Sequence, residues 1–353
     1  MRGAYYKIST MSEEARAKGL VAASAGNHAQ GVAYAAQKFG CKATIVMPTV
    51  TPLIKVNRTK SYGAEVILYG DVYDDSCAYA EKLAQERGST FVHPFDDLDI
   101  VAGQGSIAME IVQELPTVDY ILAPVGGGGL ITGVSTLAKM LNPKIKVIGV
   151  EPAAAPSMTM ALASGEPVTL DSANTIADGT AVKRVGDRIF EYAKKNIDQM
   201  LTVEDDELVG AFLDMVENHK MIVENSGLLT VAALKQLDLK GKKAVAILSG
   251  GNMDVITMSS IVQHGLIQRD RIFSASVLLP DKPGQLALVA QTIADAQGNV
   301  IKLEHNQFVS TNRNAAVELR ITMEAYGTEH KNQIMKALEE KGFRPREIGA
   351  KLY

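Results

Sequence analysis

The sequence predicts an α/β protein with parallel sheets, followed by a smaller unit of different topology. Short apolar strands alternate with helical segments from Val21 to Leu248, which is the pattern of βαβ units around a helix-covered parallel sheet. Four consecutive glycines, Gly126 to Gly129, stand between a predicted strand and a predicted helix. After Arg269 the predicted order becomes βαββαβ within about eighty residues, which is a ferredoxin-like unit.

The individual elements follow from apolar runs that end at glycine, proline or polar residues. The chain is expected to begin in a helix at Tyr5 to Ile8. In the first region we expect strands at 21–23, 43–47, 65–68 and 91–94, a helix that ends at Phe39, and helices at 52–62, 74–87 and 106–115. Gly103-Gln104-Gly105 is expected to form a turn before the last of these helices.

A second run of the same kind predicts strands at 118–125, 146–150 and 244–248 and helices at 131–141, 187–197, 204–219 and 227–237, with irregular structure at 153–184. The C-terminal unit is expected to have strands at 272–279, 299–309, 315–323 and 346–352 and helices at 283–296 and 329–341. The change of topology marks a boundary at 268/269.

Composition narrows the class of protein. The 353 residues suggest about two domains, and 46% hydrophobic and 22% charged residues are ordinary for a soluble globular protein. A net charge of -4 without a basic run gives no indication of nucleic acid or a membrane as a partner. Cys41 and Cys77 are too few for a disulfide framework and lack metal-type spacing. With no signal-like or spanning apolar segment, we expect a cytoplasmic protein.

The glycine run is typical of a phosphate-binding loop. A strand that leads into glycines and then into a helix N-terminus lets several backbone N–H groups converge on an anion, which the helix dipole also favours. Glycine is expected because a Cβ would hold the phosphate off or forbid the required dihedral angles. An isolated run of this kind is more often a linker, but its position between a strand and a helix favours the binding loop. The run lacks the lysine of a P-loop and the spacing of a dinucleotide fingerprint.

Two further polar loops also follow predicted strands. Ser24-Ala25-Gly26-Asn27-His28-Ala29-Gln30-Gly31 comes after 21–23, and Ser249-Gly250-Gly251-Asn252 comes after 244–248. In open α/β sheets ligands bind outside the carboxyl ends of the strands. The loops around Asn27, Gly127 and Ser249 are therefore expected to converge on one ligand.

Four motifs, taken in order, resemble the pyridoxal-phosphate threonine dehydratase family, also called threonine ammonia-lyases. They are Ser24 to Gly31, Gly126 to Leu130, Thr175-Ile176-Ala177-Asp178-Gly179, and Ser249 to Asn252. The tail resembles an ACT domain. The resemblance runs from Arg2 to the C-terminus. It implies the tryptophan synthase β-like type II fold of two parallel-sheet domains, with a catalytic region at 1–268 and an ACT regulatory domain at 269–353.

The resemblance also implies pyridoxal 5'-phosphate as the cofactor. Asn27 would bind its ring hydroxyl, Ser249 would face its pyridine nitrogen, and its phosphate would be held by Gly126, Gly127, Gly128 and Gly129. The substrate carboxylate would be bound by Ser24, Ala25, Gly26 and His28, although a lone histidine such as His28 is more often structural. A neutral hydroxyl at the ring nitrogen favours elimination over transamination. The implied reaction converts L-threonine, and also L-serine, to 2-oxobutanoate or pyruvate and ammonia.

Serine racemases share most of these motifs but have a second serine where this chain has Ala25. Racemisation needs an acid on the far face of the substrate, and a methyl group cannot donate a proton. Ala25 therefore favours the lyase. The segment after Glu151 resembles a cation site of those relatives, with Ala155 and Ser157 at the other positions. Because Ser157 replaces a carboxylate, the sequence leaves the metal open.

The family attaches its cofactor through the lysine of Ser-Phe-Lys-x-Arg-Gly-Ala, and here Met1 stands at x. The lysine is expected immediately before Met1, so the resemblance implies a chain shortened at its N-terminus, by a start codon assigned at an internal methionine or by a truncated gene. We favour the first because the other motifs are intact. Lys7, on a predicted helix, and Lys55, on a stretch that is expected to be exposed, are the nearest substitutes.

Two hypotheses of different classes result. One is a lyase regulated through its ACT domain, with an amino-acid effector near Gly284 and Asn299 and a homo-oligomeric assembly. The other is a non-catalytic, amino-acid-binding remnant, and a serine racemase is a third alternative. Threonine or serine preference, effector identity, dimer or tetramer, and a role in isoleucine biosynthesis or in threonine catabolism are left open.

Overall fold

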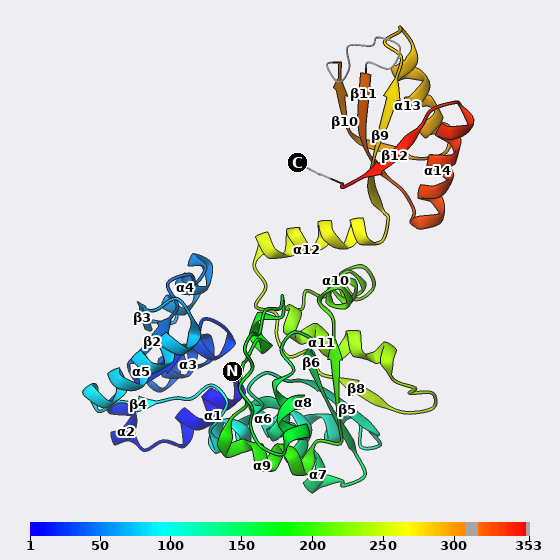
Figure 1. The fold of residues 1–353 in the computed structure, drawn as a ribbon. Coiled ribbons are helices and arrows are strands. Elements are labelled where there is room, and N and C mark those ends of the chain that lie inside the picture. Colours follow the sequence, from blue (N-terminus) through cyan, green and yellow to red (C-terminus); the bar gives the residue numbers. More distant parts are fainter. Residues whose placement is uncertain (308–316, 351–353) are drawn as a thin grey trace. The chain divides into compact units, whose positions relative to one another are not determined.

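The structure, a computed structural model, describes residues 1–307 and 317–350 and divides into two compact units (Figure 1). The first unit is Met1–Asp254 and the second is Val255–Tyr353. Helix α12 (Val255–Gln268) is grouped with the second unit, whereas the sequence-based boundary at 268/269 places it in the first. Among the described residues, no helix is both long and apolar enough to cross a membrane.

A parallel sheet of order β3-β2-β1-β4 organises the start of the chain, coloured blue to cyan in Figure 1. Every residue of β1 and β2 is buried, which is typical of parallel strands covered by helices on both faces. The elements are α1 (Arg2–Thr10), α2 (Glu13–Ala17), β1 (Leu20–Ala23), α3 (Asn27–Phe39), β2 (Ala43–Met47), α4 (Leu53–Lys60), β3 (Glu65–Leu68), α5 (Tyr73–Arg87) and β4 (Thr90–Phe91).

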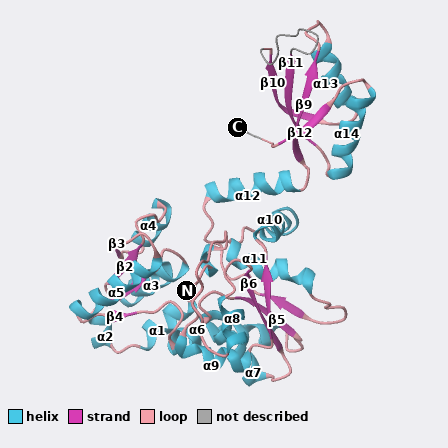
Figure 2. Ribbon diagram, viewed as in Figure 1, coloured by secondary structure: helices cyan, strands magenta, loops and turns pink. Residues whose placement is uncertain are grey.

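A second parallel sheet, of order β7-β6-β5-β8, follows in the same unit, and its strands appear as arrows in Figure 2. The elements are α6 (Leu98–Glu114), β5 (Tyr120–Pro124), α7 (Gly129–Leu141), β6 (Lys146–Pro152), α8 (Ser157–Ser164), η1 (Asp178–Thr180), α9 (Asp187–Asn196), β7 (Gln199–Val203), α10 (Asp205–Asp214), η2 (Met215–His219), α11 (Asn225–Ala233), η3 (Leu234–Gln236) and β8 (Ala244–Ala246). Strand β5 pairs with β6 on one side and with β8 on the other. The glycine run therefore begins at the carboxyl end of an inner strand.

The predicted turn at Gly103-Gln104-Gly105 is wrong, because α6 runs unbroken through it. Asp97 caps the helix, accepting hydrogen bonds from the N–H groups of Asp99 (2.9 Å) and Ile100 (3.3 Å). The glycines serve packing instead of a turn. A Cβ on Gly105 would lie 3.2 Å from the carbonyl oxygen of Gly133, so α6 and α7 pack almost backbone to backbone.

Other differences from the predicted elements also have local causes. Strand β4 ends at Phe91 instead of reaching 94, because His93 and the residues after it form a turn and Pro94 has no N–H to donate. Helix α8 lies within the segment predicted to be irregular. The sequence prediction missed β7 and α12.

The second unit has the element order β9 (Ile272–Leu279), α13 (Gln285–Asp295), β10 (Asn299–Asn306), β11 (Val317–Glu324), α14 (Thr328–Glu340), β12 (Pro345–Ile348) after α12. Its sheet, of order β10-β11-β9-β12, is antiparallel throughout. This is the predicted βαββαβ order, and the unit has its own core, which includes Phe273, Val277 and Ile321. The predicted strand ends at 309, 315 and 352 lie outside the described residues.

Candidate active site

The glycine loop joins β5 to α7, and each of its glycines is required by contacts with the protein itself. A Cβ on Gly126 would lie 3.0 Å from Cα of Thr180, and one on Gly127 would overlap the ring of Phe95. Gly128 has φ +97°, a conformation that favours glycine, and a Cβ on Gly129 would lie 2.9 Å from Cα of Phe95. The sequence analysis explained the glycines by close contact with a phosphate. The structure shows a different reason, which is close packing against Thr180 and Phe95 and the positive φ of Gly128.

The start of α7 fits an anionic group. The first N–H groups of a helix have no acceptor within the helix, and they carry the positive end of its dipole. None of the described side chains caps α7, whose N-cap is Gly128, and its first turn contains no acidic residue. These backbone donors therefore suit a phosphate, which is the group that the sequence predicted here.

The second loop, Ser24 to His28, also ends in a helix N-terminus. Gly26 is the N-cap of α3, and within the described part of the chain no side chain caps this helix and no acidic residue lies in its first turn. Ser24 Oγ accepts a hydrogen bond from Gly26 N–H at 3.1 Å, and Ala25 packs partly against the core of the first sheet. A substrate carboxylate suits this helix start for the same electrostatic reason.

His28 is held by the backbone. Its Nε2 lies 2.9 Å from the carbonyl oxygen of Val92, so this nitrogen donates. Burial lowers the pKa of His28 to about 4, which leaves the ring neutral at pH 7. A neutral imidazole with a satisfied Nε2 fits a structural role for His28, and its part in substrate binding stays a prediction.

Glu224 joins two of the predicted loops, and the sequence analysis missed it. Its Oε1 accepts from Asn27 Nδ2 at 2.6 Å and its Oε2 accepts from Asn252 N–H at 2.9 Å. The side chain is 6% exposed, and burial raises the pKa of its carboxyl group. The available signal was an acidic residue directly before the apolar helix α11.

The third loop lies beside the same carboxylate. A Cβ on Gly250 would overlap the carboxylate of Glu224, whose own N–H donates to the carbonyl oxygen of Gly250 at 3.1 Å. Ser249 is exposed, next to Gly250. On the other side, Thr180 Oγ1 lies 3.3 Å from Ser226 Oγ, so the residue that adjoins Gly126 contacts the segment that carries Glu224. The loops around Asn27 and Ser249 thus meet at one buried acid, and the glycine loop is connected to the same segment through Thr180 and Ser226.

The two substitute lysines are both paired. Lys7 Nζ lies 2.6 Å from Asp97 Oδ2, which makes an ion pair. Lys55 lies on α4, where most residues are exposed as expected, but its own side chain is 15% exposed and its Nζ bonds Asp178 Oδ2 at 2.7 Å. Burial raises the pKa of Glu224, and the charge of Lys55 opposes this rise.

Glu151 caps a helix, an arrangement that uses the acceptors a cation would need. Its carboxylate is fully buried and accepts from the N–H groups of Met158 (2.6 Å) and Thr159 (2.9 Å) and from Thr159 Oγ1 (2.8 Å). Ser157 Oγ lies 3.4 Å away, and Ala155 is buried beside them. Burial raises the pKa of the Glu151 carboxyl group. Within the described residues, no three acidic, histidine or cysteine side chains cluster as a metal site would require.

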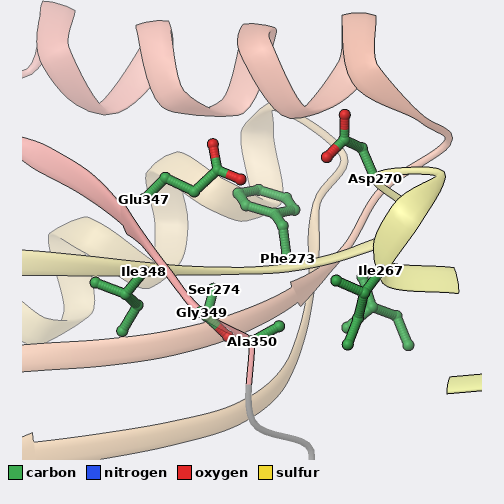
Figure 3. A pocket seen from close by; sticks show the side chains of 9 residues that line it. Ile267, Asp270, Phe273, Ser274, Glu347, Ile348, Gly349 and Ala350 are labelled. Atoms are coloured by element: carbon green, nitrogen blue, oxygen red, sulfur yellow. The ribbon is translucent and has the colours of Figure 1, made fainter. Parts of the chain in front are cut away.

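The second unit has a pocket of about 300 Å³ between the end of α12 and the β9 and β12 strands. Figure 3 shows the side chains of Asp270 and Glu347 on either side of the Phe273 ring. Lys331 Nζ joins the two carboxylates, at 2.8 Å from Asp270 and 3.1 Å from Glu347.

The two predicted regulatory residues are not among the described residues that line this pocket. Gly284 is the N-cap of α13 with φ +88°. Asn299 begins β10 and donates to Glu324 at 3.2 Å. Their role stays a prediction.

Comparison with known proteins defines the class. The family model of pyridoxal-phosphate dependent enzymes matches residues 1–250, and the chain belongs to this family. Pyridoxal phosphate is its cofactor and the first unit has the type II fold of these enzymes.

Individual relatives are more specific. The L-threonine ammonia-lyase of Thermotoga maritima is 42% identical over 350 residues, which is 99% of this chain and 87% of that protein. The processed form of threonine deaminase isoform 2 from Solanum lycopersicum has a TM-score of 0.71 and 41% identity, covering 74% of this chain and 78% of that chain. The serine racemase of Dictyostelium discoideum has a TM-score of 0.67 and 36% identity, covering 72% of this chain and 83% of that chain.

Proposed function

We propose that this protein is a threonine ammonia-lyase that converts L-threonine, and also L-serine, to a 2-oxoacid and ammonia. The observation that supports this most directly is that Glu224 joins the Asn27 and Ser249 loops, while the glycine loop is connected to the neighbouring Ser226 through Thr180. Among the described residues, no side chain caps the N-terminus of α3 or of α7. A cytoplasmic location is part of the proposal.

In this proposal the two helix starts bind the two anions. The N–H groups at Gly126 to Gly129 bind the cofactor phosphate, and those at Ser24 to His28 bind the substrate carboxylate. Asn27 gives one N–H of its amide to Glu224, which fixes the amide plane and leaves its oxygen and second N–H for the ring hydroxyl of the cofactor. Ser249 presents a neutral hydroxyl to the ring nitrogen.

The cofactor, when bound, supplies an electron sink that makes the Cα proton of an amino acid acidic enough to remove. The chain's own residues then decide the outcome. Ala25 has no proton to donate to the face of the substrate beside it, so it cannot assist reprotonation to the D-amino acid. Loss of the β-hydroxyl is therefore the favoured reaction. This is the feature that separates the lyase from the racemase, which has a related fold.

The test compares two proteins: the chain as given, and the chain with Ser-Phe-Lys placed before Met1. With saturating pyridoxal phosphate and L-threonine, we expect the extended protein to release 2-oxobutanoate and ammonia in equal amounts, and to form no D-serine from L-serine. The control is the extended protein with alanine in place of the added lysine, which should lose at least about a thousandfold in kcat because the added amine both binds the cofactor and moves the proton. No 2-oxobutanoate from the extended protein would exclude the lyase, and D-serine would favour a racemase.

We also propose that the second unit is an ACT domain that binds an amino acid and joins copies of the chain. Its βαββαβ order, the positive φ of Gly284 at the start of α13, and Asn299 at the start of the edge strand β10 support this. For calorimetry on the full chain we expect an amino acid to bind, and Asn299→Ala to weaken that binding about tenfold or more through loss of a polar contact. The matched control is Asn306→Ala at the other end of β10. Equal effects of the two variants, or no binding of any amino acid, would contradict the proposal.

A further inference from the structure

The glycine loop lies on an aromatic side chain from another part of the chain. A Cβ on Gly127 would overlap the ring of Phe95, and one on Gly129 would lie 2.9 Å from its Cα and Cβ and 3.0 Å from its carbonyl oxygen. Two of the four glycines therefore face the same residue. Phe95 belongs to the segment between β4 and α6, which links the first sheet to the second.

Phe95 is held in turn by His93. The Nδ1 atom of His93 accepts hydrogen bonds from the N–H groups of Phe95 (3.2 Å) and Asp96 (2.8 Å), and the two rings meet edge to face with centroids 4.7 Å apart. A nitrogen that accepts carries no proton, so the hydrogen of the neutral ring is on Nε2. Phe95 thus has both its backbone and its ring fixed by one imidazole.

Asp96 connects this turn to the other side of the loop. Its Oδ1 accepts from the N–H groups of Arg188 (2.9 Å) and Ile189 (3.2 Å) at the start of α9. The N-cap of α9 is Gly186, where a Cβ would lie 2.6 Å from Asp96 Oδ1. Gly186 N–H donates to the carbonyl oxygen of Gly127 at 3.0 Å. The glycine loop is therefore held on one side by Phe95 and on the other by a helix start that Asp96 caps.

We propose that Phe95 is a positioning residue that holds the Gly126–Gly129 loop in its phosphate-binding conformation, and that His93 and Asp96 fix Phe95 in turn. The proposal rests on the proposed binding of the cofactor phosphate at this loop. A loop of four glycines has more conformational freedom to lose than any other, so a binding site made from it needs contacts that preorganise it. Phe95 supplies such contacts to Gly127 and Gly129.

The test compares two ligands that form no bond to a lysine, pyridoxamine 5'-phosphate and pyridoxamine, by calorimetry on the full chain at pH 8. In Phe95→Ala, we expect the phosphorylated ligand to bind about tenfold or more weakly and pyridoxamine to change by less than about twofold, because only the phosphate uses the loop. Phe95→Leu keeps most of the volume and should give a smaller loss. The matched control is Phe91→Leu. The Phe91 ring also meets the His93 ring edge to face, but it is not among the groups nearest to the glycines of the loop.

A second pair of variants leaves Phe95 in place and keeps the test valid if Phe95→Ala does not fold. In His93→Asn the amide oxygen can occupy the position of Nδ1 and accept the same two N–H groups, whereas His93→Leu has no acceptor. We expect the asparagine variant to keep the affinity for pyridoxamine 5'-phosphate and the leucine variant to lose about tenfold.

The pair also predicts a pH effect. Burial lowers the pKa of His93, with Arg188 acting in the same direction and Asp96, Glu81 and Asp97 in the opposite one. As the pH falls through this lowered pKa, a proton on Nδ1 would face the two N–H donors and release the turn. The affinity for pyridoxamine 5'-phosphate should therefore fall in acid more steeply in the wild-type chain than in His93→Asn.

The outcomes are distinguishable. If the wild-type chain binds pyridoxamine 5'-phosphate no more tightly than pyridoxamine, the phosphate does not bind at this loop. Both the proposed phosphate site and the role of Phe95 are then refuted. If the wild type binds pyridoxamine 5'-phosphate more tightly than pyridoxamine and the Phe95 variants keep this difference in affinity, the phosphate site is supported and the role of Phe95 is refuted. Equal weakening of both ligands, or equal behaviour of His93→Asn and His93→Leu, also refutes it.

Discussion

Glu151→Ala is expected to lower the free energy of unfolding of the first unit by about 3–5 kcal/mol, because it removes the acceptor from a set of buried donors. The carboxylate is fully buried and receives three hydrogen bonds of 2.6 to 2.9 Å from Met158 and Thr159. Alanine would leave two N–H groups at the start of α8 and one hydroxyl without this partner. Denaturant unfolding, followed in the full chain, measures the loss.

Two matched variants separate this cause from a general effect of substitution. Thr159→Val removes only the hydroxyl donor and should cost about 1 kcal/mol. Glu114→Ala changes an exposed glutamate and should stay within about 0.5 kcal/mol of the wild type. A loss for Glu151→Ala no larger than that for Thr159→Val would contradict the capping role.

The same carboxyl group predicts a pH dependence with a definite sign. Because burial raises the pKa of Glu151, the folded chain keeps this proton at pH values where the unfolded chain has lost it. The group therefore contributes most to stability below its ordinary pKa, and this contribution is lost as the pH rises to the raised value. The stability difference between wild type and Glu151→Ala should shrink over that interval.

Helix α8 also connects this acid to the glycine loop. A Cβ on Gly128 would lie 2.8 Å from Cε of Met158, the residue whose N–H Glu151 accepts. If the capping role holds, a chelator should leave the midpoint of thermal unfolding unchanged, since Glu151 then stabilises the site through α8 without a cation. A drop in the midpoint that Mg²⁺ or Ca²⁺ reverses would instead assign the acid to a cation.

Gly133→Ala is expected to destabilise the first unit by about 2–4 kcal/mol, although helix propensity alone predicts a gain of about 1 kcal/mol from the same change. Gly133 lies within α7, and a Cβ there would overlap the carbonyl oxygen of Val101 and lie 2.8 Å from the N atom of Gly105. Both neighbours are backbone atoms of α6, which cannot move aside as a side chain can. The overlap therefore outweighs the propensity.

The sign of the effect is the test, measured by denaturant unfolding. Gly105→Ala, whose Cβ would lie 3.2 Å from the carbonyl oxygen of Gly133, should cost less than Gly133→Ala. Met140→Ala, on the exposed face of the same helix, should change stability by no more than about 0.5 kcal/mol. A stabilised Gly133→Ala would show that α6 and α7 can separate without cost.

The sequence alone determined the order of most elements and the family of the chain. Strands such as 43–47 and 272–279 match the structure because a continuous apolar run, or a strict alternation, leaves few other ways to bury the side chains. The glycine run and the two polar loops were found because they interrupt that pattern at strand ends. The element order, which the structure shows, and the family resemblance, which the comparisons confirm, both depend on the order of motifs along one sequence.

What only the tertiary structure decided depends on contacts between distant residues. Gly103 and Gly105 looked like a turn, and they are helical because α6 packs against α1 and α7 at backbone distance. Glu224 and Phe95 look like an ordinary helix start and an ordinary apolar residue in the sequence. Glu224 contacts Asn27, 197 positions away, and Phe95 contacts Gly127, about 32 positions away. A single sequence does not show which distant residues come close in space. Burial of a charge or a ring against a flexible loop is a property of the folded chain, and only the folded chain shows it.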